Sequence, residues 1–486
     1  MPYFNIVAQT TENTVVTEYE PVKARSDSYQ SEAELEREFI RMLTEQGYEY
    51  LTIHTEAELL ANLRTQLEKL NSYTFTDSEW SRFLKESVAN PNEHIVEKTR
   101  KIQEDFVQVL HRDDGSSKNI LLIDKKNVHN NFLQVINQYT VSQGDGAKHD
   151  NRYDVSILVN GLPLVHIELK RRGVAIREAF NQINRYQRDS FWAGCGLFEY
   201  VQIFVISNGT NTKYYSNSTR FNAIKDANSS KAKKEKTSNS FEFTSYWADS
   251  NNVVIPDLID FTRTFFARHT ILNVLTKYCV FTSENMLMVM RPYQITATER
   301  ILNRIEIATN YKKYGSVAGG GYIWHTTGSG KTLTSYKSTR NLLLDIPVFE
   351  KTVFLIDRKD LDEKTTMDFQ SYADNDLVDV DETDNVTDLI RKLGNDDRQM
   401  IVTTIQKMQI MINRRLKPAH PKYEKIKNLK IAFVVDECHR TITPGTKRIF
   451  ERFFTASLWY GFTGTPRFPE NPYPLMGDLP RTTEEL

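Results

Sequence analysis

The alternation of apolar and polar positions predicts a helix near the start of the chain. After an irregular polar beginning, the segment SEAELEREFIRML places Leu35, Phe39 and Leu43 on one helical face. Ser31 is a suitable N-cap, and Glu34 stands three residues later, which is the spacing of a capping box. We therefore predict an amphipathic helix that starts at Ser31, with polar loops interrupting the following hundred residues.

Apolar alternation typical of strands begins near Asn151, and short apolar strands recur farther on between helical segments. The later strands are YIWH at 322–325, TVFLI at 352–356, MIVTT at 400–404, IAFVVD at 431–436 and LWYGFTG at 458–464. Strands separated by helices favour right-handed crossovers and a mainly parallel sheet covered on both faces. The predicted fold class is α/β.

The same pattern predicts two domains. Residues 1–260 form a first domain with a mixed sheet, residues 261–470 form a second domain whose strand pattern begins near Arg291, and residues 471–486 begin a linker. The basic, low-complexity residues 225–240 are expected to form a solvated loop rather than a DNA contact. The acidic stretch 374–397 is expected at the surface.

Charge and cysteine content narrow the class of protein. The 62 Lys+Arg nearly balance the 63 Asp+Glu. Any binding of nucleic acid must therefore depend on local clusters of basic side chains. The three cysteines, far apart and without a Cys-x-x-Cys pair, argue against a disulfide framework and a structural zinc site. The start of the chain lacks the apolar core of a signal peptide, and no apolar run reaches the ~18 residues of a membrane span. These features indicate a soluble, cytoplasmic protein with no membrane partner.

The most specific motif is a glycine-rich loop between the strand at 322–325 and a predicted helix. Its residues are Thr327, Gly328, Ser329, Gly330, Lys331 and Thr332. Glycines let main-chain N–H groups turn inward around phosphate oxygens, and the helix N-terminus adds a favourable dipole. We expect Lys331 to contact the β- and γ-phosphates of ATP and the Thr332 hydroxyl to bind Mg²⁺. The pattern departs from the common one at its first position, where His325 replaces glycine.

Two carboxylates follow an apolar strand about a hundred residues later. A strand that ends in Asp436 and Glu437 places them at the carboxyl edge of the sheet, beside the phosphate loop. We expect Asp436 to hold Mg²⁺ through its water shell and Glu437 to polarise the attacking water. Gln294 stands upstream where it could pair with adenine N6 and N7, and Thr-Gly-Thr-Pro at 463–466 ends the last strand.

This ordered set of motifs resembles superfamily 2 helicases and translocases over residues 285–470. The resemblance implies a RecA-like motor lobe that binds ATP and Mg²⁺. It also implies that the Thr-Gly-Thr-Pro segment couples the nucleotide state to DNA contacts.

A second constellation lies in the first domain. Asp154 is followed fourteen residues later by Glu168 and Lys170, on two strands that flank Asn160-Gly161 and are expected to form a hairpin. A plain two-residue loop would pair Asp154 with Ile167 and put the two acids on opposite faces. A shared metal site therefore requires a three-residue loop or a bulge that brings Asp154 across from Glu168.

The spacing of these residues resembles the PD-(D/E)xK nucleases. The resemblance implies that Asp154 and Glu168 bind Mg²⁺ and that Lys170 supplies a further cation or orients the nucleophile. Gln182 and Tyr186, on one face of the next helix, match the Gln-x-x-x-Tyr pair that some of these nucleases carry beside the active centre. Glu32 and Glu36 are interpreted as solvated helix charges rather than as a further acidic ligand, and His166 as a structural histidine.

The whole chain resembles the motor subunit of type I restriction enzymes, nearest to the type IC group. The segments that carry the resemblance are DSYQSEAELERE from residue 27, RYDVSILVNGLPLVHIELKRRGVAIREAFNQINRY at 152–186, GGYIWHTTGSGKTLTS at 320–335 and DECHR at 436–440. The resemblance implies two partners, double-stranded DNA and a methyltransferase core of modification and specificity subunits. It also implies ATP-driven translocation of duplex DNA with cleavage far from the recognition site.

Few residues follow Pro466, so the resemblance implies that the second motor lobe and its arginine finger are absent from this chain. The chain by itself is then expected to hydrolyse ATP weakly and not to translocate DNA. Two alternatives remain: a repair or recombination nuclease-helicase without a methyltransferase partner, and an ATP-binding assembly scaffold with a vestigial nuclease.

Overall fold

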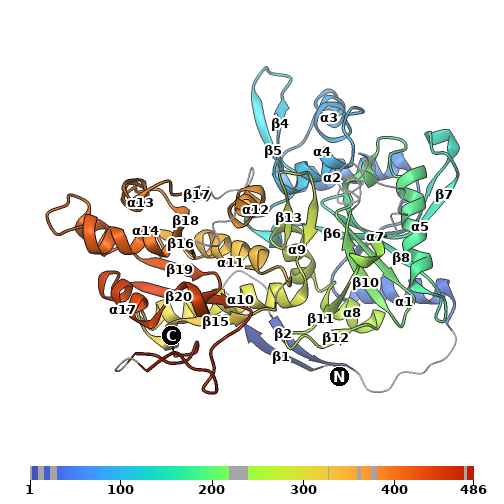
Figure 1. Cartoon of the computed structure of the whole chain (residues 1–486). Helices are drawn as coiled ribbons and strands as arrows, with labels where there is room; N and C mark the ends of the chain where they lie inside the picture. Colours follow the sequence, from blue (N-terminus) through green and yellow to red (C-terminus); the bar gives the residue numbers. More distant parts are fainter. Residues whose placement is uncertain are drawn as a thin grey trace, which may run out of the picture. The chain divides into compact units, whose positions relative to one another are not determined.

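The structure is a computed structural model. It describes residues 3–8, 16–21, 30–217, 239–326, 328–357, 363–373, 380–475 and 479–485. The chain divides into two compact units (Figure 1): residues 13–293 with 1–6, and residues 294–486 with 7–12. Residues 261–293 thus group with the first unit, whereas the sequence analysis placed the domain boundary after residue 260; the division lies close to Arg291, where the second strand pattern begins.

The first unit is built on an eight-stranded mixed sheet of order β12-β11-β10-β9-β8-β7-β6-β3. Its strands are β3 (Glu49–Tyr50), β6 (Leu133–Val141), β7 (Asn151–Val159), β8 (Leu162–Leu169), β9 (Ile203–Ser207), β10 (Thr212–Ser216), β11 (Ser245–Ala248) and β12 (Val254–Ile255). Strands β6, β7 and β8 are antiparallel, and β8 runs parallel to β9. The mixed sheet is confirmed.

Helix α1 (Glu32–Glu45) forms as the sequence predicts. The Ser31 hydroxyl accepts the Glu34 N–H and the Glu34 carboxylate accepts the Ser31 N–H, which closes the capping box. Leu35, Phe39 and Leu43 are buried, so the predicted apolar face is the packed one. Helix α1 packs against β3 and β8, and α5 (Ile176–Asp189) packs against β8 and β9.

The residues after α1 are more regular than expected. They contain α2 (Glu56–Asn71), α3 (Asp77–Phe83), α4 (Ile95–Gln103) and the hairpin β4 (Val107–His111)–β5 (Ser117–Leu121). Polar loops interrupt this stretch, as predicted, but the elements between the loops were not predicted. Capping boxes at Thr55 and Thr76 start two of these helices, and the buried face of each helix continues the core of the unit.

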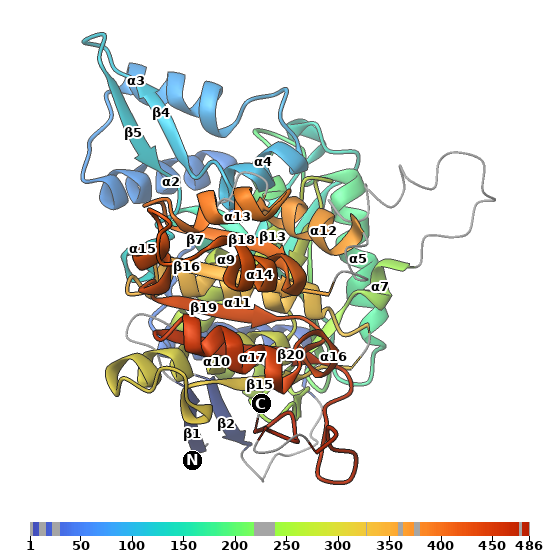
Figure 2. The same ribbon diagram turned by 60° about the vertical axis from the view of Figure 1, so that its left-hand side comes forward.

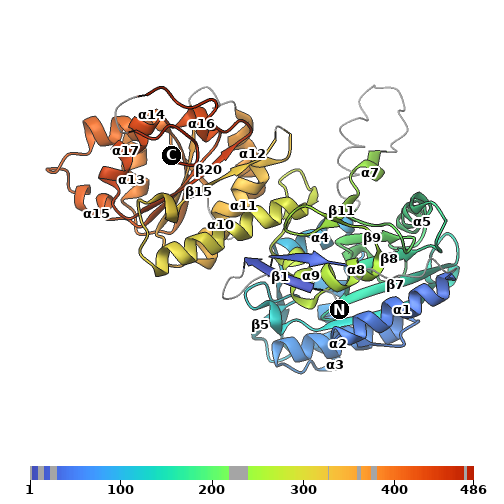
Figure 3. The ribbon, with the colours of Figure 1, turned by 90° about the horizontal axis from the view of Figure 1, so that it is seen from below.

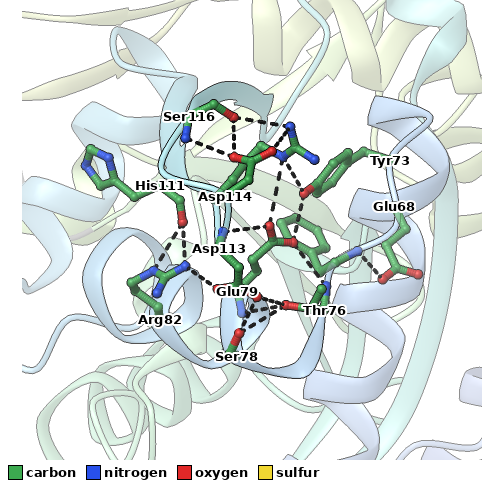
Figure 4. Close-up of polar contacts among 12 residues, drawn as sticks. Glu68, Tyr73, Thr76, Ser78, Glu79, Arg82, His111, Asp113, Asp114 and Ser116 are labelled. Carbon is green, nitrogen blue, oxygen red and sulfur yellow. Dashed lines mark hydrogen bonds and ion pairs between the residues drawn. The ribbon is translucent and has the colours of Figure 1, made fainter.

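A polar cluster fastens the β4–β5 hairpin to α3 (Figure 4). The Glu79 carboxylate accepts the Tyr73 hydroxyl and the main-chain N–H of Asp113. Asp113 in turn accepts the Ser78 hydroxyl and the Arg82 guanidinium. The hydroxyls, led by that of Ser78, and Arg82 lower the pKa of Asp113 to about 2. Because its charges are satisfied internally, we interpret this cluster as structural.

The second unit is built on a six-stranded parallel sheet of order β15-β20-β19-β16-β18-β17 (Figure 2). Its strands are β15 (Gly321–Trp324), β16 (Lys351–Ile356), β17 (Val380–Glu382), β18 (Gln399–Thr404), β19 (Ile431–Val435) and β20 (Ser457–Thr463). All five predicted strands are therefore present. Helices α10 (Pro292–Asn310) and α11 (Lys331–Asp345) lie side by side (Figure 3), and the Ser338 hydroxyl donates to Thr298 between them.

The acidic stretch 374–397 was predicted to lie at the surface, but its described residues are partly buried. It contributes strand β17 to the sheet and the helix α13 (Val386–Leu393), whose Leu389 and Leu393 are fully buried. The acidic side chains masked this apolar spacing. Most of the basic stretch 225–240 lies outside the described residues. None of the helices in the described ranges is long and apolar enough to cross a membrane.

Candidate nuclease and nucleotide sites

A β-bulge aligns the two acidic residues of the first unit. The loop Asn160-Gly161 has two left-handed residues, φ 52° and 84°, and joins the pair Val159 and Leu162. A side chain at Gly161 would also meet the Leu63 main chain, with its Cβ 2.7 Å from Cα. The loop thus has the plain two-residue length that, without a bulge, would separate the acids.

The register then shifts within β8. Leu158 pairs with Pro163, but Ile157 pairs with Val165, which leaves Leu164 as the extra residue of a bulge. The ladder continues to the pair Val155 and Ile167, and the next step brings Asp154 across from Glu168. A shared metal site required either a three-residue loop or a bulge, and the structure has the bulge.

Asp154, Glu168 and Lys170 form a compact charged group. The Lys170 ammonium donates to Glu168 Oε1 over 2.7 Å, and Asp154 Oδ2 accepts the Leu169 N–H over 2.9 Å. Burial and the neighbouring Glu168 raise the pKa of Asp154, while burial raises that of Glu168. Burial acts to lower the pKa of Lys170, but Glu168 and the other acids outweigh it and raise the pKa, so that the lysine stays charged.

This group fits a divalent cation. Glu168 is fully buried, and within the described residues its Oε2 atom has no hydrogen-bond partner. The described residues contain no group of three or more His, Cys, Asp or Glu side chains that could hold a metal ion. Mg²⁺ is commonly held by one or two carboxylates together with water and substrate phosphates, so two acids are sufficient ligands from the protein.

Gln182 and Tyr186 lie beside this group and are bonded to each other. Gln182 Nε2 donates to the Tyr186 hydroxyl over 2.7 Å, and that hydroxyl donates to the Arg152 carbonyl over 2.8 Å. Burial first, and then the charge of Glu168, raise the pKa of Tyr186. The pair therefore joins α5 to the start of β7, next to Asp154, rather than lying on the helix surface.

His166 and the two acids of α1 also lie near the site. His166 is fully buried; its Nδ1 lies 3.1 Å from the Ser156 hydroxyl and its Nε2 lies 3.8 Å from Glu168 Oε2. Burial lowers the pKa of His166 to about 4, which keeps the ring neutral. Glu32 is exposed and accepts the Arg171 N–H over 3.3 Å, but Glu36 is buried and bonded to two amides. The interpretation of Glu36 as a solvated charge was wrong.

The raised pKa values of the buried acids give a testable dependence of stability on pH. A carboxyl whose pKa is higher in the folded state stabilises the fold at low pH, and this contribution is lost as the pH rises through the folded pKa. Above that pH the folded chain bears the cost of a buried charge at Asp154. Asp154→Asn removes this cost and leaves an acceptor for the Leu169 N–H. In metal-free buffer we expect the variant to melt about 2–4 °C above the parent chain at pH 8, equivalent to ~1 kcal/mol.

The difference should shrink toward pH 4, where Asp154 is protonated in the folded chain and the pH is close to its ordinary pKa of 3.8 in the unfolded chain. Differential scanning fluorimetry of the two chains across this range measures it. Equal melting temperatures at pH 8 would contradict the assigned burial of charge at Asp154.

The glycine-rich loop of the second unit lies between β15 and α11. Gly328 and Gly330 have φ 78° and 76°, which favours glycine at both positions. Helix α11 starts at Lys331, so that Lys331 and Thr332 occupy its first turn. Gln294 is buried, and its amide donates to the carbonyls of Ser329 and Gly330 over 3.3 and 3.2 Å. Thr327 lies outside the described residues.

Lys331 is paired with an acid from the end of β19. Its ammonium donates to Glu437 Oε1, and the Glu437 N–H donates to Asp436 Oδ1 over 3.0 Å. Burial acts to raise the pKa of Glu437, but Lys331, the Gly464 N–H and His439 outweigh burial and lower it. Glu437 is therefore a charged carboxylate beside the helix N-terminus, at the carboxyl edge of the parallel sheet.

His439 bridges two motifs, and its role was not predicted from the sequence. Its Nδ1 lies 2.7 Å from Thr463 Oγ1 and 3.5 Å from Glu437 Oε2, and its Nε2 lies 3.0 Å from Thr465 Oγ1. Trp324 Nε1 adds a bond of 3.1 Å to the Gly464 carbonyl. The position of His439 next to the two carboxylates was the available signal, because the strand ends β19 and β20 are neighbours in the sheet.

Comparison with known proteins agrees with both units. The family described as "Type I restriction enzyme R protein N terminus" matches residues 29–223, and the family described as "SWI2/SNF2 ATPase" matches residues 293–474. The type I restriction enzyme EcoprrI endonuclease subunit of Escherichia coli is 50% identical over 301 residues, 62% of this chain and 90% of that protein. The SsaAORF53P endonuclease subunit of Staphylococcus saprophyticus is 39% identical over 449 residues, 91% of this chain and 43% of that protein.

A solved structure of a nuclease-deletion mutant of the Type ISP restriction-modification enzyme LlaGI with a DNA substrate mimic is 17% identical over 39% of this chain and 18% of that one, with a TM-score of 0.27. The chain thus spans most of the Escherichia coli relative but less than half of the staphylococcal one.

The fold and the two sites define a protein in which a nuclease-type α/β unit precedes an ATPase-type unit with a parallel sheet. The long alignment at 50% identity identifies its relatives. The chain belongs to the family of type I restriction enzyme endonuclease subunits.

Proposed function

We propose that this chain supplies the nuclease and the first motor lobe of a type I restriction enzyme. In the assembled enzyme it cleaves double-stranded DNA in a Mg²⁺-dependent reaction that is coupled to ATP-driven translocation. Its partners are a methyltransferase core of modification and specificity subunits, and its compartment is the cytoplasm. The observation that carries the proposal is the bulge in β8, which brings Asp154 across from Glu168 and Lys170.

In the nuclease unit each charged residue has a separate task. Asp154 and Glu168 would hold Mg²⁺, which supplies activation of water and stabilisation of negative charge at the phosphate. The Leu169 N–H fixes one oxygen of Asp154, and the Lys170 ammonium fixes one oxygen of Glu168. Lys170 is also the cation available to the scissile phosphate, because its raised pKa keeps it charged. Gln182 and Tyr186 position the start of β7 beside these groups.

In the motor unit the phosphate loop and the two carboxylates support ATP hydrolysis. Lys331 would exchange Glu437 for the β- and γ-phosphates when ATP binds, which frees Glu437 to polarise the attacking water. Thr332 and Asp436 would hold Mg²⁺ beside the phosphates. Gln294 holds the loop carbonyls in the present structure, and we retain adenine recognition as its proposed second role.

The experiment that tests this function is cleavage of circular DNA by the full-length subunit that contains this chain, assembled with its methyltransferase core. Unmodified DNA should be cut only with ATP and Mg²⁺, and DNA methylated at the recognition site should stay intact. Cleavage that needs neither ATP nor the methyltransferase core would favour a repair or recombination nuclease. Absence of cleavage across a Mg²⁺ titration, with ATP still bound, would favour an assembly scaffold.

His439 gives a further prediction for the motor. Its ring connects Glu437 to two side chains of the Thr-Gly-Thr-Pro segment, beside the direct contact of the Gly464 N–H with Glu437. We expect His439→Ala to retain ATP binding but to lower the stimulation of ATP hydrolysis by DNA about tenfold, a typical coupling between sites. ATP turnover of the assembled enzyme with and without DNA measures the effect.

The exposed His149, substituted in the same way, serves as a control. Equal loss of basal and DNA-stimulated turnover in His439→Ala would show that His439 serves hydrolysis itself and not the coupling.

A further inference from the structure

Gln138 has an unusual main-chain conformation within β6, the strand next to the edge strand β3. Its φ is 55°, in the left-handed region that side chains with a Cβ rarely adopt. The other non-glycine residues with positive φ in the described chain are Ser72, Asn160, Asn252, Asn285, Lys312 and Glu437, and all of them lie outside strands. Left-handed conformations of this kind persist only where the surroundings impose them.

The position of Gln138 relates it directly to the nuclease site. Strand β6 pairs with β7 through Asn137 and Val155 on one side and through Tyr139 and Tyr153 on the other. Gln138 therefore lies across from Asp154, and no ladder pair forms between the two residues. The strained residue interrupts the sheet at the step that carries the proposed metal ligand.

The buried carboxylate of Glu36 binds the side chains of Gln138 and of its neighbour Asn137. Its Oε2 accepts Gln138 Nε2 over 2.5 Å, and its Oε1 accepts Asn137 Nδ2 over 2.6 Å. Glu36 is 9% exposed, and no Lys or Arg of the described chain forms an ion pair with it. A buried carboxylate held only by two amides is costly, and such a group requires a compensating role.

Helix α1 contacts the strands on both sides of Asp154. Glu36 binds β6, and Glu32, one turn earlier, accepts the N–H of Arg171 just after β8. Glu32 also acts on Glu168, whose pKa its charge helps to raise. The two acids of α1 thus contact the segments that flank the Asp154 and Glu168 carboxylates, Glu36 through two side-chain amides of β6 and Glu32 through one main-chain N–H.

We propose that Glu36 and Gln138 are positioning residues for the nuclease, which hold β6 in its left-handed turn so that Asp154 faces Glu168. This inference rests on the proposed nuclease function. It assigns a task to the two features that packing alone does not explain, the conformation of Gln138 and the buried charge of Glu36. Neither residue needs to touch DNA or the cation.

Two substitutions separate positioning from stability. Gln138→Gly adopts the same φ without strain but releases the strand from Glu36, so that the fold should be retained. Glu36→Gln keeps the size of the side chain but turns an N–H₂ group toward one of the two amides that Glu36 now accepts. The controls are Asn252→Gly, at a left-handed position in a turn, and Glu45→Gln, at an exposed position of α1.

The first readout is the rise in melting temperature of the chain with added MgCl₂, without nucleotide or DNA, and with Asp154→Asn as the zero reference. The second is kcat for DNA cleavage by the assembled enzyme, beside its ATP turnover. We expect Gln138→Gly and Glu36→Gln to weaken the binding of Mg²⁺ and to lower kcat about 10- to 100-fold. Losses of this size are usual when a residue that orients a metal ligand is replaced. ATP turnover and both controls should match the parent chain.

Three other results would overturn the inference, and they differ in what they imply. If the parent chain responds to Mg²⁺ and both variants respond equally well, Gln138 and Glu36 have no positioning role and the nuclease proposal stands. If kcat falls only in step with a lower melting temperature of the metal-free chain, their role is structural. If the parent chain responds no more than Asp154→Asn, the metal site itself fails, and with it both proposals.

Discussion

Glu168→Gln is expected to abolish DNA cleavage by the assembled enzyme and to leave its ATP hydrolysis unchanged. The substitution removes a fully buried carboxylate that is bonded to Lys170 and lies across from Asp154. Without that charge the site loses one of two protein ligands for the cation and the partner that fixes the lysine. We expect a loss of at least about 10²–10³-fold, the size that removal of a preorganised electrostatic group typically causes.

Conversion of supercoiled DNA to the linear form, followed beside phosphate release in the same reaction, measures this effect. Glu178→Gln is the matched control, because Glu178 is an exposed acid on α5. Cleavage by Glu168→Gln at the parent rate would show that the carboxylate pair is not the nuclease centre.

Lys331→Ala is expected to lower ATP hydrolysis about 10²–10³-fold, again by loss of a charge placed against the developing transition state. The structure adds a second reason. Lys331 is the ion-pair partner of Glu437, and its charge is the largest influence that opposes burial and keeps the pKa of that acid low. Without the lysine, burial acts on Glu437 with less opposition, so its pKa rises.

ATP turnover at saturating DNA, compared with that of the exposed control Lys430→Ala, tests this expectation. Because cleavage in this account depends on translocation, Lys331→Ala should also leave circular DNA uncut. A variant that keeps rapid turnover would remove Lys331 from the phosphate site.

Local patterns in the sequence were sufficient for much of the fold. The capping box at Ser31 and the apolar strands before each motif involve residues within one element, so spacing alone predicts them. The same holds for the motor residues, which follow strands of one parallel sheet and therefore meet at its carboxyl edge. The bulge was deduced as a condition of the nuclease site, although the sequence alone did not indicate that Leu164 is the extra residue.

The features that the sequence did not predict depend on distant contacts. Glu36 is bonded to amides 101 and 102 residues away. Helical spacing does place it near the buried face of α1, seven residues before Leu43, but it gives no sign of the two amides that meet it there. The left-handed conformation of Gln138, whose side chain makes one of these contacts, has no signal in the local sequence either. In α13 the buried Leu389, Ile390 and Leu393 follow a run of acidic and polar residues whose abundance made the segment resemble a surface loop.

The most direct test of the central claim is to measure cleavage and ATP turnover on one preparation of the assembled enzyme carrying Lys170→Ala, with Lys331→Ala and the exposed control Lys126→Ala beside it. The account predicts that Lys170→Ala hydrolyses ATP at the parent rate but leaves DNA intact, and that Lys331→Ala loses both activities. Cleavage by Lys170→Ala, or ATP-independent cleavage by Lys331→Ala, would contradict the assignment of one nuclease and one motor to the two units of this chain.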